Sequence, residues 1–401
     1  MNPKIDKALN NGSGVLRMVP TFVPRRNGSA GGRLRLHPDD YFALGMPRGA
    51  MKERWFTATI PANNGPLAPA DEGLSHVALD DTAQDRVLFR EVVEEGKAAV
   101  VGEPLMKEHG GWPMYSKFFD YNDALFHHLH LSFADAETIG LLGKPEAYYF
   151  PPQLNNHPGT FPHTYFGYDM SVTKDEVRER LAMFEKGDNR ITELSRAYRL
   201  QLGTGWYTPP GVAHAPGSYL TYEPQWNADV NSVHENIVAG EIYPWDMLAE
   251  SCPPNKQRDM DYIMSLLDWE KNIDPDYRRH YYRPPIVDEQ KGPNFTEKWI
   301  VYGNEYFSAT ELTVPPQTTV TVKDAGAYGA IVVQGHGAIN GVAAESATML
   351  RFGQMSSDEF FVTYPAATAG VKVENHSLNE PLVMLKHFGP DNAKPDMSNG
   401  L

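Results

Sequence analysis

The sequence predicts a mainly β protein, and three features of its 401 residues point to this class. Its 34 glycines and 32 prolines imply many turns and short strands rather than long helices. Aromatic residues, which favour strands, are plentiful, with 20 Tyr and 18 Phe. From Phe295 onward, short alternating segments recur about ten residues apart, a spacing typical of an antiparallel sandwich or barrel closed by tight turns.

The length and the charge of the chain limit its classes of function. A chain of 401 residues can form two or three domains, each with a core of its own. The formal net charge of −15 argues against nucleic acid and against a membrane surface as partners, because phosphate binding needs a basic face. The acidic balance does not exclude a small anionic substrate, because a local pocket can oppose the global field.

Cysteine usage and the N-terminus indicate the compartment. Cys252 is the only cysteine, so no intrachain disulfide can form and no oxidising compartment is implied. The N-terminal residues lack an apolar stretch of signal-peptide length, and no apolar stretch approaches membrane-spanning length. These features predict a cytoplasmic protein.

Two helices are predicted close together in the middle of the chain. Residues 173–186 carry an apolar stripe, and Thr173 with Glu176 three residues later forms a capping box at their start. A second short helix is expected over residues 191–199. Together they predict a small helical insertion, at about residues 170–198, within a β domain.

The other expected elements are ordinary core-forming segments. Residues 55–60 alternate like a strand, and residues 85–96 and 256–270 have apolar side chains at helical spacing. The strands expected over residues 295–401, which include residues 347–353, carry no paired histidines. We therefore predict a structural role for that last part of the chain.

The most informative stretch is residues 126–150. Two short apolar and aromatic segments flank a glycine-containing turn, and they are predicted to pair as a β-hairpin. Residues two apart on a strand point to the same face, so His128 and His130 face one way and His127 faces the other.

The second segment of that stretch adds a carboxylate. Lys144, Glu146 and Tyr148 share one face of their strand by the same rule. Two imidazoles and a carboxylate brought side by side provide three of the four ligands of a typical metal site. The fourth is expected from a later strand, and His214 is the obvious candidate.

The segment that contains His214 reads GTGWYTPPGVAH over residues 203–214. A strand ends there in a Pro-Gly turn, and the histidine follows two residues after the glycine. This spacing resembles the second motif of the cupin superfamily, whose small jelly-roll barrels hold a metal with His and Glu. The His-x-His and Glu segments upstream make the resemblance specific.

The resemblance narrows to type I phosphomannose isomerases. Those enzymes have a Pro-x-x-x-Lys strand, then Gln-x-His, a loop, and Gly-Lys-x-Glu followed by aromatic residues. Here Pro113 and Lys117 match the first of these elements. Gly143, Lys144 and Glu146 match the last.

Further segments extend the likeness over most of residues 15–250. Residues 52–65 resemble the family's Glu-x-Trp-x-x-Ser segment. Residues 166–188 resemble its helical insertion, and residues 222–229 resemble its Glu-containing strand after the metal histidine.

The resemblance implies two cupin-type jelly-roll barrels. The N-terminal one, residues 1–290, would bind the metal and contain the helical insertion and a helical linker. The C-terminal one, residues 295–401, would be cupin-like without metal ligands. The implied function is that of a metal-dependent isomerase of carbohydrate metabolism, acting on a sugar or sugar phosphate, and a homodimer is compatible with it.

Carried over residue by residue, the resemblance assigns His128, His130, Glu146 and His214 as metal ligands. Zinc is the usual metal of the family, with manganese or iron as alternatives here, because the family has Gln where this chain has His128. The family's lysine two residues before the Glu ligand is catalytic, and Lys144 holds that place.

One departure from the family pattern concerns a cation. The family places an essential arginine on a strand after the metal histidine, yet no Arg or Lys occurs between Pro216 and Asn255. His234 lies near the equivalent position and could take over part of its role. The missing arginine favours a different or unphosphorylated sugar as the substrate.

The chemistry expected of this set is aldose–ketose interconversion through an enediolate. A divalent metal would stabilise charge on the sugar's oxygens, and a base must remove the carbon-bound proton. Lys144 is assigned as that acid or base. Glu223, with Asp229 or His234, would shuttle protons or orient the sugar.

Two other functions fit the same residues. Three histidines and one glutamate are also the ligands of cupin oxygenases and decarboxylases that hold iron or manganese. A non-catalytic sugar-binding protein with two cupin barrels would keep the fold and lose catalysis together with the arginine.

Overall fold

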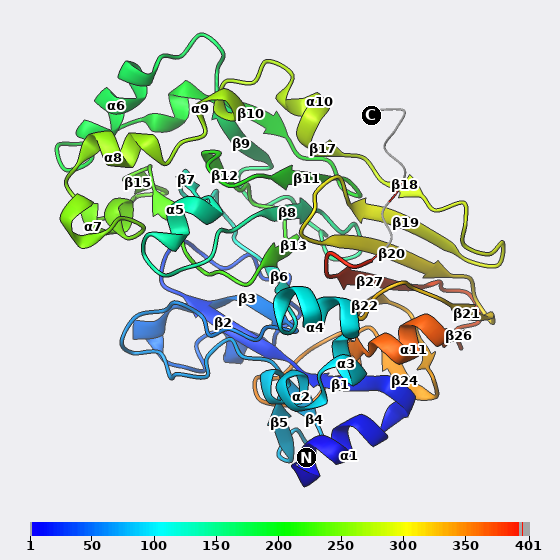
Figure 1. The fold of residues 1–401 in the computed structure, drawn as a ribbon. Coiled ribbons are helices and arrows are strands. Elements are labelled where there is room, and N and C mark those ends of the chain that lie inside the picture. Colours follow the sequence, from blue (N-terminus) through cyan, green and yellow to red (C-terminus); the bar gives the residue numbers. More distant parts are fainter. Residues whose placement is uncertain (1, 393–394, 396–401) are drawn as a thin grey trace.

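The computed structural model describes residues 2–392 and 395, and strands make up most of its regular structure. In that part of the chain the strands form five sheets with antiparallel pairing (Figure 1). The mainly β class predicted from the sequence is confirmed. No described helix is both long and apolar enough to cross a membrane.

A seven-stranded sheet forms the centre of the first half, in the order β17-β11-β8-β13-β6-β3-β2. Along its strand β6, Met114 and Phe118 pack into the main core, whereas Lys117 between them points to the other face. Its strands are β2 (Thr21–Arg25), β3 (Ala50–Phe56), β6 (Met114–Phe119), β8 (Glu146–Tyr149), β11 (Gly205–Thr208), β13 (Thr221–Trp226) and β17 (Tyr282–Arg283).

A five-stranded sheet, in the order β10-β9-β12-β7-β14, lies opposite the seven-stranded sheet. Side chains of the two sheets meet, since His130, just after β7, contacts Glu146 on β8 at 3.0 Å. Its strands are β7 (His128–Leu129), β9 (His163–Tyr168), β10 (Ser195–Arg199), β12 (His214–Ala215) and β14 (Ser232–Val233). A small separate pair joins β15 (Ile237–Val238) to β16 (Glu241–Ile242).

The predicted hairpin over residues 126–150 is wrong. Its two strands, β7 and β8, belong to different sheets, and the helix α5 (Phe133–Glu137) connects them. Ser132 caps this helix by accepting a hydrogen bond from the backbone N–H of Asp135. The histidines and the glutamate therefore meet across the space between two sheets rather than along one.

The second half is built on a nine-stranded sheet and a four-stranded sheet that pack against each other around a second core. The larger contains β1 (Val15–Val19), β4 (His76–Ala78), β5 (Arg86–Leu88), β18 (Ile286–Val287), β19 (Thr296–Val301), β20 (Ser308–Val314), β22 (Tyr328–Gln334), β25 (Glu359–Val362) and β27 (Leu382–Phe388). The smaller contains β21 (Thr319–Val322), β23 (His336–Ile339), β24 (Val342–Glu345) and β26 (Val371–Asn375). Residues 347–353, expected as a strand, form only an isolated bridge from Leu350 to Leu36.

The pairing refines the predicted division of the chain. Strand β1 pairs with β25, so N-terminal residues extend the sheet of the C-terminal half. None of the sheets closes on itself in the strand pairing of the described residues. The two closed jelly-roll barrels, and the boundary between residues 290 and 295, stay predictions.

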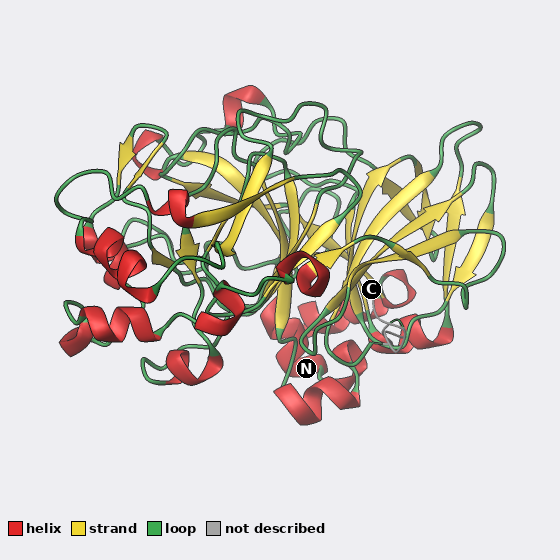
Figure 2. Cartoon of the chain, turned by 90° about the horizontal axis from the view of Figure 1, so that it is seen from above, coloured by secondary structure: helices red, strands yellow, loops and turns green. Residues whose placement is uncertain are grey.

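The helices are short and lie mostly to one side of the sheets, as Figure 2 shows. Helices α6, α7 and α8 gather at the outer edge of the first half, whereas α1 to α4 and α11 gather around β1 in the lower part of Figure 1. Their bounds are α1 (Pro3–Asn10), α2 (Phe89–Gly96), α3 (Ala98–Val101), α4 (Glu103–His109), α6 (Lys174–Ala182), α7 (Trp245–Ala249), α8 (Met260–Ser265), α9 (Trp269–Asn272), α10 (Tyr277–Tyr281) and α11 (Tyr364–Ala369).

Of the two helices expected at about residues 170–198, only the first is confirmed, and their role as an insertion stays a prediction. Helix α6 has the predicted capping box, with Thr173 and Glu176 bonded reciprocally. The second helix, expected over residues 191–199, is wrong beyond a single 3₁₀ turn at Ile191–Leu194. Ser195–Arg199 instead forms β10, because pairing with β9 supplies its backbone hydrogen bonds.

A buried ion cluster joins the two halves. Arg54 on β3 makes a bidentate contact with Asp358, at 2.7 and 2.8 Å, and reaches Glu359 on β25 at 3.0 Å. Burial, together with the charge of Asp358 and against that of Arg54, raises the pKa of Glu359 to about 8. This carboxyl therefore binds its proton more tightly in the folded chain than in the unfolded one.

The raised pKa predicts a pH-dependent effect of Glu359→Gln. The stability that the protonated carboxyl contributes is complete below its unfolded pKa of about 4.3 and is lost as the pH rises toward 8. Because glutamine cannot ionise, the variant should gain about 1–3 kcal/mol relative to the wild type between about pH 5 and pH 9. Denaturant unfolding over a pH series measures this difference. The exposed residue Glu179 on α6 provides the control, Glu179→Gln, and a difference for Glu359→Gln that does not change with pH would contradict the prediction.

Candidate metal centre

Three buried imidazoles converge from the five-stranded sheet. His128 on β7 and His214 on β12 are direct antiparallel partners, and their ring centroids lie 4.2 Å apart. His130 follows two residues after His128 on the same face, as predicted. One nitrogen from each ring lies within 4.8 Å of the others, and this is the one group of three or more potential metal ligands within residues 2–392.

The backbone before His214 turns sharply to deliver this side chain. Gly211 adopts a φ of +78°, which side chains with a Cβ rarely adopt, and a Cβ there would also approach Asp268 to 3.0 Å. The Pro-Gly turn read from the sequence therefore has a steric basis.

Main-chain carbonyls fix the orientation of all three rings. Each histidine's Nδ1 lies 2.8 Å from a carbonyl oxygen, which can only accept a hydrogen bond, so Nδ1 carries the proton. The three carbonyls are those of Phe126 for His128, Val230 for His130 and Val212 for His214. Each Nε2 is left with a lone pair, which is the form that binds a metal.

Glu146 meets these nitrogens from the opposite sheet. Its Oε2 lies 3.0 Å from His130 Nε2, and its Oε1 lies 3.1 Å from His214 Nε2. Tyr148 donates a hydrogen bond to Oε1 at 2.6 Å. Carboxylate oxygens and unprotonated nitrogens are both acceptors, so their close approach is favourable only when a cation lies among them.

Lys144 provides one such cation. Its Nζ lies 2.9 Å from Glu146 Oε2 and donates to His130 Nε2 at 3.1 Å. Burial alone would raise the pKa of Glu146, but Lys144 and the neighbouring imidazoles hold this pKa well below its usual range. Burial and the charge of Lys144 lower the pKa of His130 to about 4, which keeps this ring neutral near pH 7.

The donor set fits a divalent metal. His214 Nε2 is buried without a hydrogen-bond partner, and its ring groups with those of His128 and His130. Neutral imidazoles with one carboxylate are ligands that suit zinc, iron or manganese. The residues that could hold the ion are His128, His130, His214 and Glu146.

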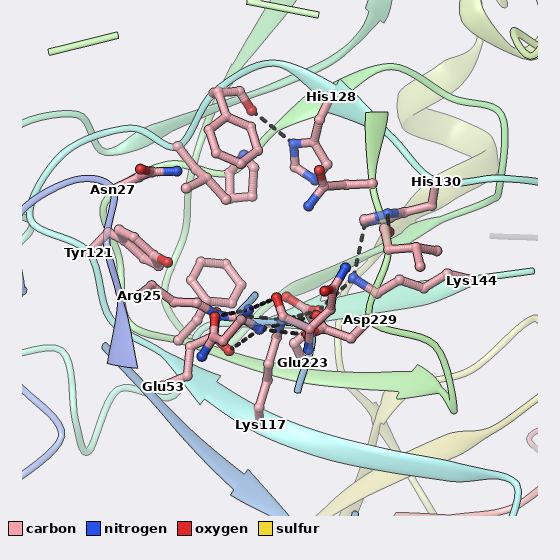
Figure 3. A pocket seen from close by; sticks show the side chains of 18 of the residues that line it. Arg25, Asn27, Glu53, Lys117, Tyr121, His128, His130, Lys144, Glu223 and Asp229 are labelled. Atoms are coloured by element: carbon pink, nitrogen blue, oxygen red, sulfur yellow. Dashed lines mark hydrogen bonds and ion pairs between the residues drawn. The ribbon is translucent and has the colours of Figure 1, made fainter. Parts of the chain in front are cut away.

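A row of charged side chains crosses one face of the seven-stranded sheet, and we call it the charge row (Figure 3). In order from β2 to β8 its members are Arg25, Glu53, Lys117, Glu223, Lys144 and Glu146. Their signs alternate, and neighbouring charged atoms lie between 2.9 and 3.9 Å apart. Each charged side chain thereby has a neighbour of opposite charge type within 4 Å, although the row is mostly buried.

The charge row, together with His128 and His130, lines one cavity of about 360 Å³. Asp229 lies at the same wall and accepts hydrogen bonds from Arg25 at 3.1 Å. Burial and the charge of Glu146 raise the pKa of Glu223 to about 8, although Lys117 opposes the shift. A carboxyl that exchanges its proton near neutral pH thus lies 3.8 Å from Lys144.

The residues singled out in the sequence lie in two places. His128, His130, Lys144, Glu146 and Glu223 line the cavity. His214 completes the imidazole cluster.

His234 lies elsewhere. Its buried ring is next to that of His127, at 6.4 Å between centroids, and it is not among the described residues that line the cavity. His127 faces away from the metal ligands, as predicted, and its Nε2 contacts Ser195 Oγ at 2.7 Å.

Sequence reasoning missed the cations that the N-terminal segment brings to the cavity. Arg25, Arg26 and Arg48 all line it, although no Arg or Lys follows His214 before residue 256. Arg25 ends strand β2, and its place beside β3 depends on pairing that its local sequence does not reveal.

The ligand geometry predicts stoichiometric metal binding. Chelator-stripped protein reloaded with Zn²⁺ should bind one ion per chain. His214→Ala should weaken zinc binding by at least about 100-fold. Losing a group that only hydrogen-bonds a metal ligand lowers metal affinity by about 10- to 100-fold, and losing the ligand itself should cost more. Equilibrium dialysis with elemental analysis measures both quantities. His376→Ala, which changes an exposed histidine in the C-terminal half, should bind like the wild type. Full zinc occupancy in His214→Ala at matched free metal would contradict the assignment.

The comparisons with known proteins show a shared fold. No protein family model and no curated protein sequence matches the chain. The mannose 6-phosphate isomerase of Bacillus subtilis superposes with a TM-score of 0.62 and 17% identity, over 93% of this chain and 99% of that one. A mutant phosphomannose isomerase of Salmonella typhimurium gives 0.61 and 11%, over 94% and 100%. A zinc-bound mannose 6-phosphate isomerase gives 0.60 and 11%, over 94% and 99%. The chain therefore shares the fold of solved mannose 6-phosphate isomerases over nearly its whole length.

Proposed function

We propose that the protein is a metal-dependent sugar isomerase that interconverts an aldose and a ketose through an enediolate. The observation that carries the proposal is the position of Lys144, 2.9 Å from the Glu146 carboxylate that contacts His130 and His214 of the imidazole cluster. Such a site combines a place for a divalent ion with a group that can donate or accept a proton. The fold shared with solved mannose 6-phosphate isomerases supports the same function.

The reaction moves one proton between neighbouring carbons and needs no oxidant. A base removes the proton from C2 of the aldose, the electron pair forms the C1–C2 double bond, and charge collects on the O1 oxygen. Return of a proton to C1, with transfer of the O2 proton to O1, gives the ketose. The catalyst must therefore stabilise oxygen charge and exchange protons with two adjacent carbons.

In this proposal His128, His130, His214 and Glu146 hold the ion. When bound, a divalent metal supplies positive charge that stabilises the developing oxyanion. Zinc is the metal we propose, with manganese or iron as alternatives, because all three accept nitrogen and carboxylate ligands. Two cupin-type jelly-roll barrels complete the proposed architecture.

Lys144 has the role of acid and base. Its Nζ belongs to the cavity wall, where it can exchange a proton with a sugar carbon or oxygen. Glu223 orients this ammonium from 3.8 Å and accepts a hydrogen bond from a sugar hydroxyl. We assign no step to His234, whose ring lies beside that of His127.

Replacing Lys144 should separate metal binding from turnover. We expect Lys144→Met to keep one metal ion per chain and to lower kcat for aldose isomerisation by about 100-fold or more, the usual contribution of a positioned acid or base. Lys298→Met, which changes a partly exposed lysine outside the cavity, should leave kcat unchanged. An unchanged kcat in Lys144→Met would remove this residue from the mechanism.

Isomerisation in D₂O tests the enediolate itself. Incubation of the metal-loaded protein with a panel of free and phosphorylated aldoses should give a ketose that carries solvent deuterium at C1, seen by NMR, because the proton returned to C1 exchanges with water. Ketose without deuterium would indicate direct hydrogen transfer. Oxygen consumption without any ketose would favour the cupin oxygenase instead.

A further inference from the structure

We propose that the cavity selects an uncharged sugar over its phosphate ester, an inference that rests on the proposed isomerase function and specifies its substrate class. It is carried by the charge row, because the buried cations that line this cavity are already compensated by carboxylates. A phosphate dianion would have to displace those carboxylates or lie against them.

The first compensated cation is Arg25. Its Nη2 lies 3.1 Å from Glu53 Oε2 and 3.1 Å from both oxygens of Asp229, while its Nη1 donates to Asn64 Oδ1 at 2.9 Å. Its donors are therefore directed at protein acceptors. An arginine committed in this way does not offer the free fork that binds a phosphate.

Lys117, Lys144 and Arg48 also have carboxylate partners within the protein. Lys117 lies between Glu53, at 3.9 Å, and Glu223, at 3.2 Å. Lys144 lies 2.9 Å from Glu146. Arg48 makes two contacts of 2.6 and 2.7 Å with the carboxylate of Glu72.

Arg26 is the exception at this cavity. It is exposed, and it makes no hydrogen bond or ion pair with any other residue between 2 and 392. The carboxylates of Asp229 and Glu250 line the same cavity. Asn63 donates a hydrogen bond to Asp229 at 2.7 Å through its backbone N–H and to Glu250 at 2.8 Å through its side chain. A single solvated cation gains little from an added anion, because solvent screens the pair.

The same carboxylates suit a neutral polyol. Ionised Glu and Asp oxygens accept hydrogen bonds from hydroxyl groups, and each oxygen has more than one lone pair available. Asp229 and Glu53 are held in place by Arg25, so they can bind sugar hydroxyls without a further cost of ordering. The cavity of about 360 Å³ falls within the usual size of small-molecule sites.

Binding of unreactive polyols tests the inference on the zinc-loaded protein. D-mannitol and D-glucitol lack the carbonyl group and cannot isomerise, and their phosphate esters differ from them only by the anion. We expect calorimetry to show that each free alditol binds at least about tenfold more tightly than its ester at the same pH and ionic strength. The ratio should fall as salt is added, because screening weakens the repulsion.

Removing one carboxylate should narrow this preference. In Asp229→Asn, Arg25 keeps only Glu53 as an anionic partner, so the ratio of ester Kd to alditol Kd should decrease by about threefold or more. Asp261→Asn, which removes an exposed carboxylate on α8, should leave the ratio unchanged. Metal content measured on each variant confirms that the site is intact.

The opposite result would overturn the proposal. If the esters bind more tightly than the free alditols, the cavity selects phosphate, and loss of that advantage in Arg26→Gln would assign it to the exposed arginine. Failure of every alditol and ester to bind at millimolar concentration would overturn it equally, because the cavity would then not be a sugar site.

The two proposals fail separately. Faster isomerisation of aldose phosphates than of free aldoses would contradict the substrate class and leave the isomerase function standing. A clear preference for free alditols, without isomerisation of any aldose, would contradict the isomerase and leave the selectivity of the cavity standing.

Discussion

The site depends on how three imidazoles are held by main-chain carbonyls. Because each Nδ1 donates to a carbonyl at 2.8 Å, each Nε2 is an acceptor, and those of His130 and His214 lie 3.0 and 3.1 Å from the carboxylate of Glu146. Burying so many acceptors without a cation would be costly. Lys144 meets part of this demand, and a divalent ion would meet all of it. The same constraint that requires a cation therefore brings the Lys144 ammonium next to the imidazoles.

The two sheets contribute different side chains to the site. The five-stranded sheet supplies the imidazoles, whereas the seven-stranded sheet supplies Glu146 and the charge row that runs back to Arg25. Alternation of sign across adjacent strands makes a largely buried polar wall tolerable, because each charge has a partner of opposite sign within 4 Å. The result is a wall that is polar but nearly neutral in sum. Such a wall fits a substrate rich in hydroxyl groups better than one that carries a dianion.

Local patterns in the sequence predicted local features of the site, and pairing between distant strands decided the rest. The alternation of a strand placed His128 and His130 on one face and His127 on the other. The hairpin was wrong because two apolar segments with a turn between them do not reveal that a short helix redirects the chain to another sheet. Arg25 was missed for a similar reason, since nothing near β2 indicates that it lies beside Glu53 and Asp229.

Anomalous diffraction at the zinc edge, from crystals of the zinc-loaded protein, tests the central claim most directly. The account predicts one ion within about 2.0–2.2 Å of the Nε2 atoms of His128, His130 and His214 and of a Glu146 oxygen. It also predicts that Lys144 Nζ lies nearby without being a ligand. An ion bound elsewhere, or no ion between the imidazoles at full zinc loading, would contradict the account.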